Sequence, residues 1–141
     1  MSYCTLTDLT ERYGDEVTQW ADRDRDGTPD PELIAAAFAD VDAEIDSYLA
    51  ARYTLPLSAT PLVVVRIACA LVRERLALAN GARMDATDPV KTEAGDARKL
   101  LQAIGSGKAS IGLPNPIQTS DGVQMQTGGR VWDRAAAAGY L

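Results

Sequence analysis

The 141-residue chain contains no histidine. This absence removes the commonest general base near neutral pH and the commonest ligand of transition metals. Aromatic residues make up only 6% of the chain, while 46% of its residues are hydrophobic, so a core must be built mainly from Ala, Leu, Val and Ile. We expect a single domain and no enzymatic activity, since an enzyme would have to work with carboxylates, Lys, Tyr or Cys.

Long apolar runs are also missing. No stretch approaches the ~20 residues of a membrane span, and the N-terminus lacks the basic start and apolar run of a signal peptide. The two cysteines, Cys4 and Cys69, show no metal-binding or redox spacing, and the apolar surroundings of Cys69 predict a buried thiol. We therefore expect a protein that is made in a reducing cytosol and has no membrane partner.

The charge of the chain is unevenly distributed. The net charge of −6 argues against a protein whose main task is to grip phosphate backbones. Residues 1–60 carry 13 acidic and 4 basic side chains, whereas residues 61–105 and 106–141 carry net charges of +2 and +1. One end of the fold should thus be acidic, which would either align packed subunits or only maintain solubility.

Helix signals recur along the first three quarters of the chain. Asp30-Pro31, Thr60-Pro61 and Asp88-Pro89 are typical helix starts, because proline suits the first turn of a helix and a small polar residue caps it. The fold class predicted is mainly α, a bundle of about four to five helices. The expected helices run from Thr5 or Thr7 to Tyr13, from Glu16 to Ala21, from Pro31 to near Arg52, from Leu62 to Ala79, and from Pro89 to Gly105.

Two of these helices should form the centre of the core. Apolar residues recur at helical spacing along both of them, which indicates that their apolar faces pack together. The residues predicted to make this contact are Leu33, Ala37, Val41, Ile45 and Leu49 against Leu62, Val65, Cys69, Val72 and Leu76.

The composition changes after residue 105. Residues 106–141 contain six glycines and two prolines and lack helical periodicity until a short segment at 133–138. We divide the chain into a helical body, 1–105, and an extended C-terminal arm, 106–141; the alternative is a disordered tail. Side chains of the arm with no helical stripe to join are predicted to contact neighbouring subunits: Lys108, Ile111, Leu113, Ile117, Arg130, Val131, Trp132 and Tyr140.

Residues 22–30 resemble the beginning of a calcium-binding loop. Carboxylates stand at positions 1, 3, 5 and 9, with glycine at position 6, where the chain must turn sharply. Position 12 is Leu33 in place of the expected glutamate, and two arginines dilute the negative charge. Two interpretations stay open: a weak calcium site, or a metal-free Asx-turn loop that caps the following helix. The candidate ligands are Asp22, Asp24, Asp26 and Asp30.

Other constellations do not favour catalysis. Asp42 and Asp46 have the spacing of an ordinary solvated helix face, and Cys4 has no histidine to activate it. The string from Gly105 to Ser110 lacks the spacing of a phosphate-binding loop and follows a helix where such a loop would open one. No catalytic residue and no required cofactor are predicted.

Taken in order, several blocks of the sequence resemble the Mu-type head–tail connector (neck or adaptor) family of tailed bacteriophages. The most specific blocks are Asp46 to Leu57 and Gly107 to Leu113. The resemblance covers nearly the whole chain, and its matching pieces lie within residues 3–14, 18–30, 45–57, 66–69, 107–113 and 128–132.

This resemblance implies a structural role. It implies a multi-helix adaptor in the neck of the virion, assembled in the host cytoplasm as a homo-oligomeric ring, with twelve copies to match a portal. The implied partners are the portal protein, tail or stopper and terminator proteins, and DNA that passes through a central channel without sequence recognition. The main alternative is a calcium-dependent helical protein-binding module. A regulatory DNA-binding protein conflicts with the negative charge and with the lack of a basic recognition helix.

Overall fold

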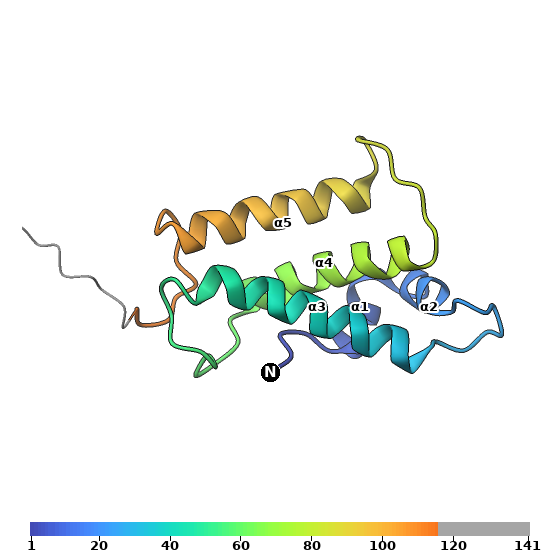
Figure 1. Ribbon diagram of the computed structural model, residues 1–141, viewed down its shortest axis with the longest axis horizontal. Helices are drawn as coiled ribbons and strands as arrows, with labels where there is room; N and C mark the ends of the chain where they lie inside the picture. Colours follow the sequence, from blue (N-terminus) through green and yellow to red (C-terminus); the bar gives the residue numbers. More distant parts are fainter. Residues whose placement is uncertain (116–141) are drawn as a thin grey trace, which may run out of the picture.

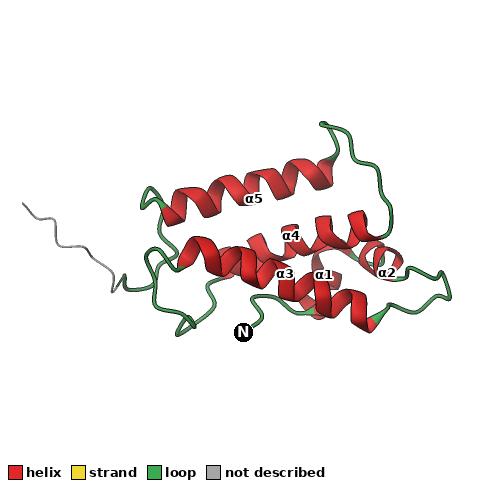
Figure 2. Ribbon diagram, viewed as in Figure 1, coloured by secondary structure: helices red, strands yellow, loops and turns green. Residues whose placement is uncertain are grey.

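Five helices account for the regular structure of residues 1–115. The computed structural model describes residues 1–115, and within that range every element is an α-helix (Figures 1 and 2). The predicted mainly α fold is confirmed. The helices are α1 Leu6–Tyr13, α2 Glu16–Ala21, α3 Pro31–Leu49, α4 Leu62–Ala79 and α5 Pro89–Gly105.

Capping residues explain two of the helix starts. The Thr5 hydroxyl accepts a hydrogen bond from the Asp8 amide at 3.2 Å, and the Asp8 carboxylate accepts one from the Thr5 amide at 2.8 Å, which is a capping box. The Asp88 carboxylate accepts a hydrogen bond from the Val90 amide at the start of α5. Asp30 stands at the N-cap position of α3 without capping it, because its carboxylate accepts a hydrogen bond from the Arg23 amide instead.

Helix α4 is the centre of the bundle. It packs against each of the other four helices, and its side chains are buried on nearly every side. In Figure 1, α3 and α5 run along α4, while α1 and α2 lie at the end of the bundle nearer the C-terminus of α4. Among the helices of residues 1–115, none is both long enough and apolar enough to cross a bilayer.

The predicted core is confirmed in most positions. On α3 the four residues from Ala37 to Leu49 at four-residue spacing are buried, and on α4 so are Cys69, Val72 and Leu76. Leu33 and Val65 are half-buried. The prediction was wrong for Leu62, which is 74% exposed. Side chains of a helix lean toward its N-terminus. The side chain of Leu62, the first residue of α4, therefore projects beyond the end of the helix.

Two arginines join the three long helices on the outside of the core. The Arg98 guanidinium lies 2.7 Å from both Glu44 on α3 and the buried Glu74 on α4. Arg75 adds a second contact to Glu44 at 3.6 Å. Hydrogen bonding to Glu74 raises the pKa of Arg98, so the buried carboxylate is held beside a permanent positive charge.

Candidate functional site

The residues that follow α3 and those that follow α5 meet at one end of the bundle. The Arg52 Nη1 donates hydrogen bonds to the carbonyl oxygen of Ile104, at 3.2 Å, and to that of Ala109, at 3.1 Å. The Ile111 amide donates to the Tyr53 hydroxyl at 3.4 Å. The two most specific blocks of the sequence therefore form one structural unit, which we call the C-terminal junction.

Two glycines permit this close approach. A Cβ on Gly105 would lie 3.0 Å from the carbonyl oxygen of Tyr48, so the backbones of α3 and α5 can approach this closely only because Gly105 has no side chain. Gly107 has φ +85°, a conformation that favours glycine, and it lets the Lys108 amide turn back to the carbonyl oxygen of Ala103 at 2.8 Å. The chain is thereby directed along the Arg52 side chain.

The described part of the predicted arm is attached to the helical body. Ile111 is only 5% exposed and belongs to the core of its own chain, and Ala109 and Leu113 pack against that core. The expectation that Ile111 is free to insert into a neighbouring subunit is therefore wrong for the folded chain, because Tyr53 and the end of α5 provide its pocket. The contacts of the body extend past residue 105 to Leu113, while Lys108 is exposed.

The remaining interface predictions cannot be placed. Ile117, Arg130, Val131, Trp132 and Tyr140 lie outside the described residues. A role in assembly stays a prediction for them, and for Lys108 and Leu113.

A small hollow lies beside the C-terminal junction. Its volume is about 300 Å³, and it is lined by Tyr53, Thr54, Pro56, Leu57, Ser58, Leu113 and Pro114. The Leu55–Pro56 peptide bond is cis. The lining combines apolar rings with hydroxyl groups and carries no charged side chain, so the hollow is suited to holding an apolar side chain.

The acidic loop brings together three of its four candidate metal ligands. Carboxylate oxygens of Asp22, Asp24 and Asp26 lie within 4.8 Å of one another. Asp30 is not in this group, since its carboxylate accepts the hydrogen bond from the Arg23 amide. The three gathered carboxylates are the ones that a calcium loop would use at positions 1, 3 and 5.

Backbone amides already occupy these carboxylates. Asp22 accepts hydrogen bonds from the amides of Asp26, at 3.1 Å, and Gly27, at 2.8 Å. Asp26 accepts from both the amide and the hydroxyl of Thr28, which lowers the pKa of Asp26. The loop thus contains Asx-turns, as the metal-free interpretation predicts, but Asp30 does not provide the cap on α3 that this interpretation also predicts. Whether it also binds calcium weakly stays a prediction.

A cluster around Arg73 joins four helices and was not predicted. Its guanidinium lies 2.8 Å from Glu16 on α2 and 3.0 Å from Glu93 on α5. The same guanidinium stacks on the Tyr13 ring of α1, 4.3 Å from the ring centroid. Burial, followed by the hydrogen bond that the Tyr13 hydroxyl donates to Glu93, raises the pKa of Tyr13. One guanidinium thus joins α4 to two carboxylates and an aromatic ring on three other helices.

The two cysteines also come together, although 64 residues separate them in the sequence. Both are buried free thiols, and the sulfur of Cys4 interacts with that of Cys69. That interaction, together with burial, raises the pKa of the Cys4 thiol. The same interaction lowers the pKa of the Cys69 thiol, so the two shifts oppose each other. Both thiols lie in the core, where burial limits the access of reagents to them.

Comparison with known proteins places these features in one group of sequences. Residues 3–127 match the model of a protein family described as Bacteriophage Mu, Gp36. Gene product J of Escherichia phage Mu is 31% identical over 140 residues, which cover 95% of this chain and 96% of that protein. The Mu-like prophage FluMu protein gp36 of Haemophilus influenzae is 31% identical over 115 residues, covering 79% of this chain and 78% of the relative.

Proposed function

The chain belongs to the Bacteriophage Mu Gp36 family, and from this premise we propose that it is a structural head–tail connector subunit of a tailed phage. Copies of the chain form a ring below the portal, twelve of them where the ring matches a portal. The ring links the capsid to the tail and lets DNA pass through its centre. The portal protein and a tail-side stopper or terminator protein are its partners in the neck of the virion.

The C-terminal junction is the observation that carries this proposal. A connector subunit needs a rigid body and a segment that is fixed to this body at one end and contacts neighbouring subunits at the other. Arg52 and Tyr53 hold the residues after α5 against the body by two hydrogen bonds, and Arg52 makes a third to Ile104 at the end of α5 itself. The 26 residues that follow Asn115 therefore start from a fixed point at one end of the bundle.

The charge distribution supports a channel-forming role. Residues 1–60 carry a net charge of −9, and the acidic loop between α2 and α3 is largely exposed. An acidic wall repels the phosphate backbone, so DNA passes without being held.

The clusters of charged residues favour a structural protein over an enzyme. Arg73 and Arg98 each pair with two carboxylates from different helices. Each cluster joins helices, which is a structural role.

A calcium-dependent protein-binding module is the second candidate. It is favoured by one observation, the approach of the Asp22, Asp24 and Asp26 carboxylates to within 4.8 Å. In that case partner binding would depend on calcium, whereas a connector should bind its portal equally well in the presence of a chelator.

Size-exclusion chromatography with light scattering tests these two functions. The full-length chain is run alone and with the purified portal protein, in calcium and in a chelator. We expect a complex with the portal that contains many copies of the chain and does not depend on calcium. No portal complex under either condition would contradict the connector, and a complex that forms only in calcium would favour the module.

A shortened chain tests the part played by the arm. Removal of residues 119–141 leaves the described helices and the C-terminal junction in place, so the helical circular dichroism signal should be retained. We expect this variant to lose its self-association and its portal binding. If it assembles like the full-length chain, the interface lies on the helices.

A further inference from the structure

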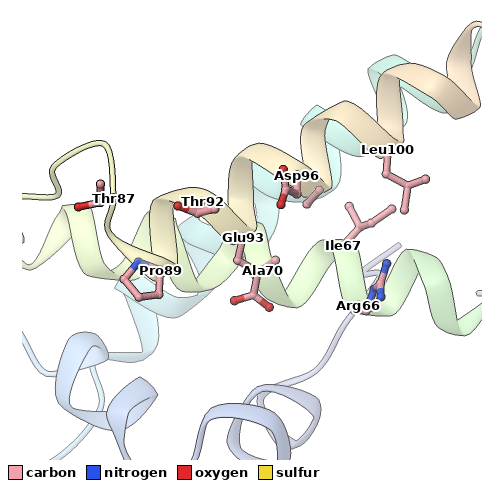
Figure 3. Close-up of a pocket in the computed structure, with 10 residues that line it drawn as sticks. Arg66, Ile67, Ala70, Thr87, Pro89, Thr92, Glu93, Asp96 and Leu100 are labelled. Atoms are coloured by element: carbon pink, nitrogen blue, oxygen red, sulfur yellow. The ribbon is translucent and has the colours of Figure 1, made fainter.

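A groove runs between α4 and α5 on the surface of the bundle (Figure 3). Its volume is about 620 Å³, which makes it larger than the hollow at the C-terminal junction. The two helices run antiparallel, and the labelled side chains in Figure 3 come from both of them and from the loop before α5. The lining residues are Arg66, Ile67, Ala70, Thr87, Pro89, Thr92, Glu93, Asp96, Ala97 and Leu100.

Small side chains create this groove. Ala70 on α4 and Ala97 on α5 are the alanines of its lining, and both are nearly covered, at 3% and 8% exposure. An alanine side chain ends at Cβ, so the two form a low floor between the helices, here called the notch, most of which neighbouring side chains cover. Ile67 and Leu100 provide an apolar wall beside the notch.

The rim of the groove carries charges of both signs. Asp96 is exposed, with 66% of its side chain accessible, and pairs only with Lys99 of its own helix among the described residues. Arg66 is exposed and makes no ion pair within residues 1–115. An occupant should therefore combine one large apolar side chain with flanking basic and acidic groups.

We propose that this groove receives Trp132 of a second copy of the chain. The segment 130–134 reads Arg-Val-Trp-Asp-Arg, and it offers an aromatic ring for the notch, arginines for Asp96 and Asp133 for Arg66. Trp20, the other tryptophan, already lies over Arg73 inside the bundle. A tryptophan buries about 150–250 Å² of surface and often anchors an interface. The inference rests on the proposed ring and names the contact that closes it.

The length of the chain allows this contact between copies. Trp132 is the seventeenth residue after Asn115, and an extended chain spans at most ~3.3–3.6 Å per residue, or about 55–60 Å here. Helix α4, with 18 residues, is about 27 Å long. The segment thus has the reach to cross to a neighbour. Since the junction and the groove are different surfaces, the contact is head-to-tail, the type of interface that closes rings.

Photo-crosslinking from position 132 tests the inference in the full-length protein. A benzophenone amino acid replaces Trp132, the variant is assembled with its portal, and adducts are mapped by mass spectrometry. Mixing isotopically labelled and unlabelled copies separates cross-links between copies from those within one. We expect mixed-isotope adducts at Ile67, Ala70 or Leu100.

Two pairs of variants show whether the groove is responsible. Asp96→Lys reverses an exposed charge on the rim, and Asp40→Lys is its control, because Asp40 is similarly exposed at 65% but lies on α3. Asp96→Lys should lower the affinity between copies by about tenfold, and Asp40→Lys should leave this affinity unchanged. Ala97→Leu fills the notch and should reduce the cross-links, whereas Gln102→Leu, on the exposed side of α5, should leave them unchanged.

The outcomes separate this inference from the proposed function. Cross-links confined to one copy, or located outside the groove, would overturn the inference, and rings that still bind the portal would leave the connector function intact. A protein that neither forms rings nor binds the portal would contradict the connector function itself. Mixed-isotope adducts in the groove, lost in Asp96→Lys and retained in Asp40→Lys, would support the inference.

Discussion

Replacing Arg52 with alanine removes both hydrogen bonds that join the end of α3 to the residues around the C-terminus of α5. They run to the carbonyl oxygens of Ile104 and Ala109 at 3.2 and 3.1 Å. A hydrogen bond from a charged donor contributes about 1.5–3 kcal/mol. Because Arg52 is half-buried, hydrogen bonds to water compensate for part of the lost contribution. We therefore expect the free energy of unfolding to fall by about 2–3 kcal/mol. For a domain of this size that corresponds to a Tm lower by about 8–12 °C.

Thermal unfolding followed by circular dichroism at 222 nm measures this loss, and hydrogen exchange locates it. The amides of Ala109 and Ile111 should exchange faster in Arg52→Ala than in the unchanged protein. The amides in the middle of α4 should remain the better-protected ones. Arg83→Ala is the matched control, because Arg83 is exposed in the loop before α5 and makes no ion pair within residues 1–115. If Arg52→Ala melts within about 1 °C of Arg83→Ala, the junction does not hold the C-terminal segment as described.

Three further predictions follow from burial and from the acidic loop. Ile45→Asp places a charge at a position with 0% exposure and should cost several kcal/mol in urea unfolding, so an unchanged midpoint would show that the α3 face is misassigned. Calorimetry should find no calcium affinity in the sub-micromolar range for the loop of residues 22–30, because Leu33 stands where a calcium loop has a bidentate glutamate and Asp30 lies apart from the other three carboxylates; tight binding would overturn this. The thiols of Cys4 and Cys69 should react slowly with a thiol reagent in the native protein and promptly in urea, since both are buried; equal rates would contradict their position in the core.

The helices were predictable because their signals are local. Apolar spacing, a proline in the first turn and a glycine after the last turn lie within a few residues of each other, and four of the five predicted helices match closely. Helix α3 ends at Leu49, before the predicted end near Arg52. Arg52 lies outside the helix and its side chain binds the end of α5, a tertiary contact that no local pattern reports.

The contacts that matter most for the candidate site could not be predicted from the sequence. Tyr53 and Ile111 approach each other only after the helices have packed, and the same holds for Cys4 and Cys69. One signal was available for Ile111: an isolated apolar residue between glycines can pack on its own body as well as on a neighbour. We placed the boundary between body and arm at residue 105 because the composition changes there. The buried side chain of Ile111 shows that the core of the body includes residues beyond this boundary.

Immunogold labelling of purified virions tests the central claim most directly. Antibodies raised against the helical body of this chain are applied to intact particles and to particles whose tails have been detached. The proposed function predicts gold at the junction between head and tail in intact particles and at the exposed vertex of detached heads. Labelling along the tail tube or over the capsid surface, or absence of the chain from purified particles, would contradict the account.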